Sequence, residues 1–274
     1  MLLLPLAPLL HCRPSPVYHR IPIPFVYTIT EHGDSLYVST STGEVFRFHP
    51  DHPDSVVRIA KRAAYPIRGL AFKQDGTLYT SSYTGGVCTA MNGTLIDRPK
   101  MWRTSWTLEL DPFDNIWLAG RQGVFRQTGD TLTEFSNLRE AYDIRFFSGR
   151  IAVAHRKGIT IYDTLTEKAV WSSEHRSVFW CVAVFDSLLT GGCMDSILLV
   201  RQGKEYLLPL TPPYNTPWAI VRNRRGTLFL GTQFGLYRLK AGETKLRCIA
   251  FKGKCIKSLH IDRNGRLWVG TYFN

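Results

Sequence analysis

The sequence lacks most of the short motifs that mark enzymes and metal sites. It contains no CxxC pair, no HExxH, no GxSxG and no glycine-rich phosphate loop. Its six cysteines are scattered, which predicts buried free thiols; a disulfide, with Cys248 and Cys255 nearest in sequence, stays an alternative in an oxidising compartment. No apolar run approaches the roughly 20 residues that cross a bilayer as a helix. We therefore expect no metal, no cofactor and no locally encoded catalytic site.

The N-terminus is apolar but does not form a complete targeting signal. Residues 1–10 read MLLLPLAPLL, which resembles the hydrophobic region of a signal peptide. Two prolines interrupt this run and no basic residue precedes it, so an N-terminal extension or an outer strand are alternatives. We assign residues 1–16 to this extension or partial signal peptide and residues 17–274 to one domain. Export would place that domain in the periplasm or another extracytoplasmic space.

The charge of the chain is strongly positive. Lys and Arg number 34 against 22 Asp and Glu, which gives a net charge of +12. Such an excess favours solubility and anionic partners. Nucleic acid is disfavoured as a partner, because the basic residues are spread along the chain and form no stripe on a known binding module.

One strand–turn–strand sequence pattern recurs along the chain. Residues 256–274 read IKSLHIDRNGRLWVGTYFN, which is an alternating strand, a turn and a second strand. Residues 105–126 and 217–239 repeat this pattern and add a third strand. Alignment of the first strand gives seven copies, starting at residues 26, 67, 105, 141, 179, 217 and 256, at spacings of 36 to 41 residues. A period of this length indicates a repeat architecture.

Four short strands in each of seven repeats predict an all-β fold, a seven-bladed β-propeller of four-stranded antiparallel blades. There is no Trp-Asp dipeptide, which disfavours the WD40 variant. The fourth residue of each copy is aliphatic and should be buried near the axis: Ile29, Leu70, Leu108, Ile144, Val182, Ile220 and Leu259. The last copy stops after its second strand. We expect residues 17–21 to complete this incomplete blade in part, as its outer strand, so that the two chain ends meet.

The repeat resembles a known family. Residues 262–271, DRNGRLWVGT, and residues 226–237, GTLFLGTQFGLY, are similar to the two-component regulator propeller repeat. The resemblance extends from residue 26 to the end and is strongest in copies three, six and seven. It implies the periplasmic sensor region of a bacterial hybrid two-component receptor, many of which recognise oligosaccharides. The implied partners are an oligosaccharide and a histidine kinase region on the same longer chain or on a partner chain; a homodimer is a further expectation.

The second residue of each copy opens an inner strand at one rim of the predicted propeller. These residues are Tyr27, Arg68, Trp106, Tyr142, Trp180, Trp218 and Lys257. Loops between second and third strands reach the same rim and add Tyr83, Arg121, His155 and Arg156. Aromatic rings stack on sugar rings, while guanidinium and ammonium groups hold carboxylates or sulfates. The rim therefore predicts a binding site for an anionic or partly anionic oligosaccharide.

Alternative interpretations stay open for the rim and for the function. Strand alternation puts the second residue on the same side as the aliphatic fourth residue, so the rings could instead pack between blades. A propeller lyase or glycosidase acting on an anionic sugar would draw catalytic residues from separate blades and show no local motif. A protein-interaction platform is the third alternative. The favoured hypothesis is a sensor propeller without catalytic residues.

Overall fold

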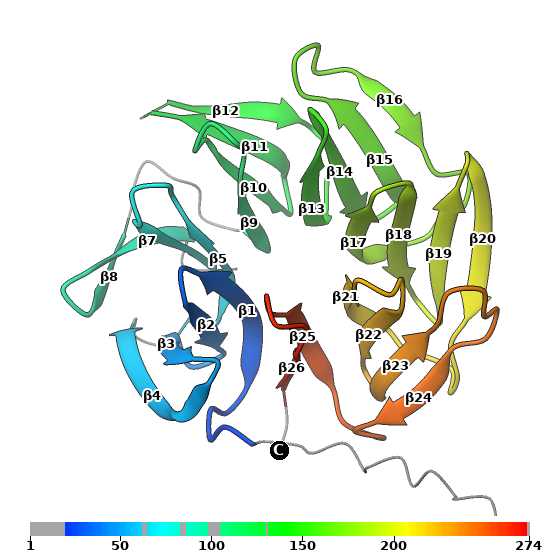
Figure 1. Cartoon of the computed structure of the whole chain (residues 1–274). Coiled ribbons are helices and arrows are strands. Elements are labelled where there is room, and N and C mark those ends of the chain that lie inside the picture. The colour runs from blue at the N-terminus through cyan, green and yellow to red at the C-terminus, as the bar shows by residue number, and fades with distance from the viewer. Residues whose placement is uncertain (1–19, 62–64, 83–85, 98–104, 130, 273–274) are drawn as a thin grey trace, which may run out of the picture.

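The computed structural model describes residues 20–61, 65–82, 86–97, 105–129 and 131–272. These residues form 26 β-strands and no helix, which confirms the all-β prediction. The strands are grouped into antiparallel units arranged around a central axis (Figure 1). In this part of the chain no helix is long and apolar enough to cross a membrane.

The first two units share one eight-stranded sheet, because a parallel bridge between Lys61 and Thr94 joins their outer strands. The first unit contains β1 (Val26–His32), β2 (Ser35–Thr40), β3 (Glu44–His49) and β4 (His52–Lys61). The second contains β5 (Ile67–Phe72), β6 (Leu78–Ser82), β7 (Gly86–Met91) and β8 (Thr94–Asp97).

Four separate four-stranded sheets follow. The third unit contains β9 (Thr107–Leu110), β10 (Ile116–Gly120), β11 (Gly123–Thr128) and β12 (Thr131–Ser136). The fourth contains β13 (Ala141–Phe147), β14 (Arg150–His155), β15 (Gly158–Asp163) and β16 (Ala169–Ser172). The fifth contains β17 (Phe179–Phe185), β18 (Leu188–Cys193), β19 (Ser196–Arg201) and β20 (Lys204–Pro209). The sixth contains β21 (Pro217–Arg222), β22 (Leu228–Thr232), β23 (Gly235–Leu239) and β24 (Arg247–Ala250).

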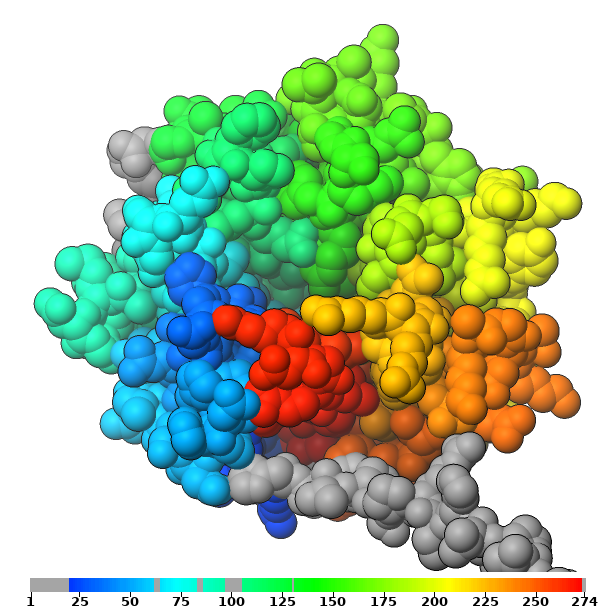
Figure 2. Space-filling view, viewed as in Figure 1, coloured from blue at the N-terminus to red at the C-terminus, as the bar shows by residue number. Residues whose placement is uncertain are grey.

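The last unit has two strands in the described part of the chain, β25 (Ile256–Ile261) and β26 (Leu267–Thr271). The inner strands β1, β5, β9, β13, β17, β21 and β25 contact one another in succession, and β25 also contacts β1. The ring is therefore closed, and its units are compatible with the seven predicted blades. Figure 2 shows the C-terminal unit, in red, seated between the blue first unit and the yellow and orange sixth unit.

The hydrophobic core lies between neighbouring units. Of the aliphatic residues expected near the axis, Leu70, Leu108, Ile144, Val182, Ile220 and Leu259 are at most 8% exposed. Ile29 is half-buried and packs against the core cluster of the first unit. The prediction is confirmed for the other six, which belong to the buried core clusters, whereas Ile29 is less buried than expected.

Three strands have no clear counterpart in the repeat pattern of the sequence. They are β7 and β8 in the second unit and β16 in the fourth. The residues of β7 are largely small (GVCTAM), and β16 is a four-residue outer strand with mostly exposed side chains. Such strands form through backbone pairing with a neighbouring strand and do not need alternating hydrophobicity.

The described residues of the N-terminal segment pack on the core of the first unit and form no strand. Residues 17–19 lie outside the described residues, and Arg20 and Ile21 form no strand. Ile21 and Ile23 pack instead against the same cluster as Trp268 of β26. Pro22 and Pro24 alternate with these isoleucines and have no amide hydrogen to donate to a ladder, which disfavours strand pairing of residues 21–24.

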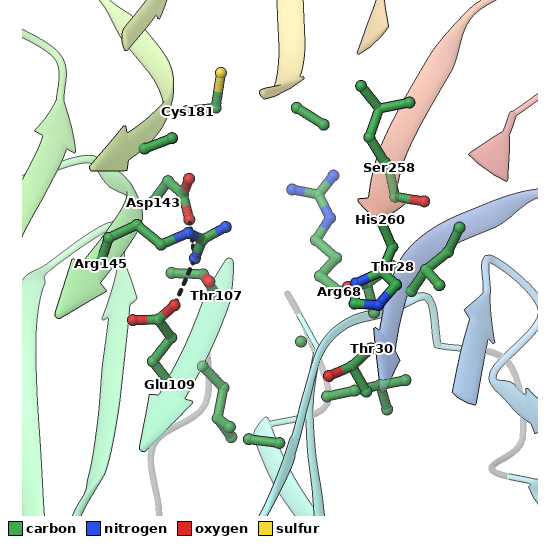
Figure 3. A pocket seen from close by; sticks show the side chains of 18 of the residues that line it. Thr28, Thr30, Arg68, Thr107, Glu109, Asp143, Arg145, Cys181, Ser258 and His260 are labelled. Carbon is green, nitrogen blue, oxygen red and sulfur yellow. Dashed lines mark hydrogen bonds and ion pairs between the residues drawn. The ribbon is translucent and has the colours of Figure 1, made fainter. Parts of the chain in front are cut away.

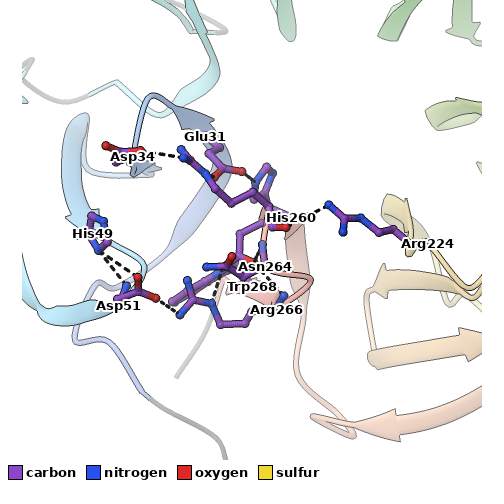
Figure 4. Close-up of polar contacts among 11 residues, drawn as sticks. Glu31, Asp34, His49, Asp51, Arg224, His260, Asn264, Arg266 and Trp268 are labelled. Carbon is purple, nitrogen blue, oxygen red and sulfur yellow. Dashed lines mark hydrogen bonds and ion pairs between the residues drawn. The ribbon is translucent and has the colours of Figure 1, made fainter.

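The two ends of the described chain nevertheless meet, as expected. The Phe25 and Tyr272 rings lie 6.0 Å apart edge to face. Polar contacts join the same two units (Figure 4). Arg263 in the β25–β26 turn donates to Glu31 at 2.9 Å and to Asp34 at 2.8 Å, and Arg266 donates to Asp51 at 2.6 Å. The first and last units are thus linked by ion pairs between their turns.

Asp262 organises the turn that carries these arginines. Its carboxylate accepts the backbone amides of Asn264 and Arg266, the Arg266 Nε at 2.6 Å and the Trp268 Nε1 at 3.0 Å. Gly265 has a φ of +81°, which a tight turn requires. One buried carboxylate therefore fixes both the turn and the indole that packs on the first unit.

We expect Leu108→Ala to destabilise the protein by roughly 2 to 5 kcal/mol, since Leu108 is 3% exposed and its removal leaves a cavity between units. Leu165→Ala is the matched control, because that leucine is 91% exposed. It should change the free energy of unfolding by less than about 0.5 kcal/mol. Chemical denaturation measures both; equal effects would contradict the buried position.

Asp262→Asn should cost roughly 2 to 4 kcal/mol, because it weakens four hydrogen bonds at a buried site. Asp34→Asn removes one ion pair from a carboxylate whose side chain is 78% exposed, and should cost about 0 to 1 kcal/mol. Thermal unfolding of both variants tests this ranking. A similar loss from both would mean that Asp262 is not the organising group of the turn.

Candidate functional site

A channel of about 1110 Å³ runs along the axis of the ring. Residues of all seven inner strands line it, and Figure 3 shows side chains from several of these strands facing one another across it. The second residues of the seven repeats all belong to this lining, as predicted for one rim: Tyr27, Arg68, Trp106, Tyr142, Trp180, Trp218 and Lys257. A cavity of this size accommodates a small-molecule ligand.

A bulge at the second position directs these side chains to the mouth. In β1, β5, β13, β17, β21 and β25 the strand register shifts between the first and third residues. The start of β9 has an equivalent irregularity. Ala119 is paired with Thr107, and its carbonyl also accepts the backbone amide of Trp106. Because a bulge interrupts the alternation of side chains, the second and fourth residues do not follow simple parity. Strand parity alone therefore does not decide whether these rings pack between blades or face a ligand.

Aromatic rings form a continuous arc along one side of the mouth. Trp106 stacks on Tyr142 with ring centroids 4.5 Å apart and an interplanar angle of 12°. Tyr142 lies 4.4 Å from Trp180, and Trp180 lies 5.4 Å from Trp218. All four side chains are half-buried, so each ring shares part of its surface with a neighbour and part with the channel.

Two cations complete the ring of side chains. The Lys257 Nζ lies 3.0 Å above the centroid of the Trp218 ring and 5.9 Å from that of Tyr272. The Arg68 guanidinium lies 5.3 Å from the centroid of Tyr27, and Tyr27 is 5.3 Å from Tyr272. The rings of Tyr272 and Tyr27 therefore lie between the two cations, and the faces of such rings attract positive charge.

The Lys257 amine is electrostatically unusual. Burial lowers its pKa from 10.5 to about 8; the nearby Cys255 opposes this shift, and the positive charge of Arg68 adds to it. Among the described residues no carboxylate forms an ion pair with Lys257. An anionic ligand at this position would restore the charged form of the amine.

The predicted loop residues that the structure describes do not join this ring. Tyr83 lies outside the described residues. Arg121 and Arg156 are exposed and are absent from the channel lining; Arg156 pairs with Glu140 at 3.2 Å. His155 is the clearest correction, because its side chain is 4% exposed and packed within the fourth unit.

The surroundings of His155 explain its buried position. Its Nδ1 accepts the amide of Lys157 at 3.3 Å, so the proton is on Nε2, which lies 3.0 Å from the Thr160 hydroxyl. Burial lowers the pKa of His155 to about 4, and the charges of Arg176 and Lys157 act in the same direction. This histidine is a satisfied structural residue and not a rim group.

A polar cluster that sequence reasoning missed lies on the channel wall (Figure 3). The Arg145 Nη1 is 2.8 Å from Glu109 and 3.1 Å from Asp143. Asp143 also accepts the amides of Ile144 and of Val182 in the next unit, both at 3.0 Å. The cluster thus joins the third, fourth and fifth units across the channel wall.

Burial governs the protonation of these carboxyls. It raises the pKa of Glu109 to about 7. The positive charge of Arg145 opposes this shift, and the negative charge of Asp143 adds to it. Burial also raises the pKa of Asp143, against the effect of Arg145. Burial therefore favours the protonated form of Glu109, which can donate as well as accept a hydrogen bond.

On the opposite wall, His260 lies 3.2 Å from Glu31, which also accepts from Arg263. Glu109, Arg145 and His260 are the fifth residues of their repeats. The sequence does contain a sign of these groups, because an ionisable residue directly follows the buried fourth residue in each of the three repeats. Among the described residues no group of three His, Cys, Asp or Glu is placed to hold a metal ion.

The fold and the axial channel define a β-propeller. Residues 250–273, which contain β25 and β26, match the family model described as two component regulator propeller. The resemblance predicted from the repeat is confirmed in this segment. No curated protein sequence matches the chain.

Solved propellers share the fold at low sequence identity. The extracellular domain of a hybrid two component system from B. thetaiotaomicron superposes with a TM-score of 0.74 and 16% identity, over 95% of this chain and 38% of that one. A second such domain from the same organism gives 0.71 and 13%, over 93% and 39%. The WD40 propeller domain of Doa1 gives 0.75 and 12%, over 91% and 90%. These identities show the fold alone, and the chain spans under two fifths of the first two structures.

We expect Glu109→Gln to flatten the pH dependence of stability. The folded protein binds the Glu109 proton more tightly than the unfolded chain, so wild-type stability falls as pH rises from about 4.5 to 7. Between pH 5 and 8 this loss amounts to roughly 2 kcal/mol, and the variant should not show it. Denaturation at both pH values measures the difference, and the comparison cancels other groups such as His155. Glu134→Gln, at an exposed position on β12, is the control; parallel curves for all three proteins would contradict the prediction.

Proposed function

We propose that this chain is the ligand-binding propeller of an extracytoplasmic sensor in a two-component signalling system, and that its ligand is an oligosaccharide with at least one acidic group. The match of residues 250–273 to the two component regulator propeller supports the sensor class. The similar fold of the two extracellular domains supports it further, because those domains belong to hybrid two component systems. The kinase region would lie on the same longer chain or on a partner chain.

The arc of rings at the channel mouth is the observation that supports the ligand class. Trp106, Tyr142, Trp180 and Trp218 place four aromatic side chains side by side at one opening. Adjacent sugar rings can stack on such a surface through their C–H faces. Lys257 at the end of the arc and Arg68 beyond Tyr272 and Tyr27 would receive the acidic groups.

Binding by neutral oligosaccharides and by their uronate counterparts of equal length tests this assignment. We expect Arg68→Gln to weaken the anionic ligands by roughly 10- to 100-fold, the equivalent of about 1.5 to 3 kcal/mol for a charge-assisted contact. Neutral ligands should change by less than about twofold. Titration calorimetry measures both series.

Two further variants make the result specific. Trp180→Ala should weaken neutral and anionic ligands alike, because stacking does not depend on charge. Arg225→Gln alters an exposed arginine in the β21–β22 turn and should leave both series unchanged. If no oligosaccharide binds, or if Trp180→Ala leaves binding intact in a folded protein, the proposed ligand class is wrong.

A propeller enzyme acting on an anionic sugar is the second candidate. The observation in its favour is Glu109, whose pKa of about 7 suits a general acid in the channel wall. Its carboxylate is bound to Arg145, which also binds Asp143. Turnover of an oligosaccharide that is lost in Glu109→Gln would favour this enzyme over the sensor.

A further inference from the structure

The positive charge of the chain is concentrated in one part of the ring. Residues 211–255, which contain the sixth unit and the connections on either side of it, include nine Lys and Arg but a single Glu. Their net charge is +8, whereas the rest of the chain carries +4. The basic residues are therefore less evenly spread than expected, and one unit presents most of the field that an anionic partner would meet.

Most of these basic side chains are exposed and unbalanced. The exposed ones are Arg224, Arg225, Lys240, Lys245, Arg247, Lys252 and Lys254. Among the described residues none of the seven forms an ion pair with a carboxylate. Glu243, the one acid in this stretch, accepts the backbone amide of Lys240 at 3.0 Å. One carboxylate cannot neutralise so many cations, so the surface keeps an excess of positive charge.

Like charges also face each other across the outer strands of this unit. Arg238 of β23 and Arg247 of β24 are directly opposite partners in the ladder, so their side chains lie on the same face of the sheet. Like charges in this position destabilise a sheet. A partner that carries negative charge would relieve the repulsion.

The basic side chains lie at the outer rim of the ring, away from the channel. In Figure 1, β24, in orange, lies on the outside of the ring close to β20 of the fifth unit. Leu208 of β20 and Leu246, which directly precedes β24, pack against one core cluster, so the two outer strands are neighbours. None of the seven exposed cations lines the channel. This rim is therefore separate from the candidate ligand site.

Exposed apolar side chains lie on the same two outer strands. Ile249 of β24 and both Tyr206 and Leu207 of β20 are exposed although they are large and apolar. A cavity of about 430 Å³ is present at the same unit, and its lining includes Leu246 and Lys252. Protein surfaces that lie at a membrane interface combine Lys and Arg with apolar and aromatic side chains in this way.

A lipid bilayer fits this rim better than a polyanion in solution. A soluble polyanion would be held by the cations alone and would leave Tyr206, Leu207 and Ile249 in water. A bilayer uses both kinds of group, because its anionic headgroups attract Lys and Arg while its interfacial layer accepts tyrosine and aliphatic side chains.

We propose that the outer rim of the fifth and sixth units, formed by β20 and β24, docks on a lipid bilayer that contains anionic phospholipids. The cations at and after β24 face the headgroup phosphates, and the exposed apolar side chains of both strands enter the interfacial layer. Docking through the rim leaves the channel mouth open, because the mouth lies on a face of the ring and not on its circumference. This contact goes beyond the proposed function and does not depend on a ligand in the channel.

Co-sedimentation with lipid vesicles tests the proposal. One set of vesicles contains phosphatidylcholine alone, and the other contains phosphatidylcholine and phosphatidylglycerol in equal amounts. At about 0.1 M salt we expect the protein to bind the mixed vesicles at least about tenfold more strongly than the neutral ones. Binding should weaken as the salt concentration rises, because salt screens exposed charges.

Two double variants with the same change in net charge locate the contact. Lys245→Gln with Arg247→Gln should lower the partition coefficient on mixed vesicles about 10- to 30-fold, since each cation near an anionic surface contributes a factor of roughly five. Arg150→Gln with Lys168→Gln removes two exposed cations from the fourth unit and should lower it less than about threefold. Equal losses from both would overturn the proposal, because net charge alone would then explain the binding.

The apolar residues distinguish a bilayer from a soluble polyanion. Tyr206→Ser with Leu207→Ser should weaken binding to mixed vesicles by about fivefold or more, and should leave binding to dextran sulfate unchanged. If this variant is folded and binds the vesicles as well as the wild type does, the bilayer is the wrong partner. Failure of the wild-type protein to bind mixed vesicles at about 0.1 M salt also overturns the proposal. Oligosaccharide titration of Lys245→Gln with Arg247→Gln should match the wild type, so the rim and the channel mouth are tested separately.

Discussion

The one-residue bulge that recurs at the start of the inner strands determines what the channel contains. Without it, strict alternation would bury the second residue together with the aliphatic fourth residue. The register shift between Ile67 and Gly69, and its equivalents in the other inner strands, separates these two positions. The third residue then lies close to the next unit: a Cβ on Gly69 would meet the Ser81 Oγ at 2.5 Å and the Leu108 Cβ at 2.9 Å. Close packing of the units and exposure of the second residue at the mouth thus have one origin.

Closure of the ring depends on a different set of forces from those within each unit. Within units, antiparallel ladders hold the strands together. Between the last and first units, Arg263 and Arg266 reach acidic residues in the turns of the first unit, and Ile21 and Ile23 pack on its core. The arginine side chains are 51% and 38% exposed, so their ion pairs are partly screened by water and each contributes little. Apolar packing around Trp268 and Phe48 must therefore supply most of the closure.

The sequence was sufficient for the fold because the repeat is written in residues that the fold requires. The aliphatic fourth residues and the turn of Asp262 and Gly265 each have one structural role, so their pattern predicted the units and the turns. Short strands such as β16 could not be predicted from the sequence, because backbone pairing alone defines them. His155 was misplaced because its position beside a loop says nothing of the Thr160 hydroxyl that holds it inside the unit. The Glu109 and Arg145 pair joins residues 36 positions apart, and only the closed ring brings them together.

The polar groups along the channel are arranged in a way that would orient the proposed anionic ligand. The acidic groups among the described channel residues lie below the mouth: Glu109 and Asp143 contact Arg145, and Glu31 contacts His260. The second residues of the repeats, which form the mouth, include two cations and no carboxylate. An acidic group carried deep into the channel would meet Glu109 and Asp143, whereas one at the mouth would meet Lys257 and Arg68. For the proposed ligand, an acidic group at the mouth would meet the two cations of the second residues, whereas deeper acidic groups are already matched by Arg145 and His260, so the mouth would be its favoured position.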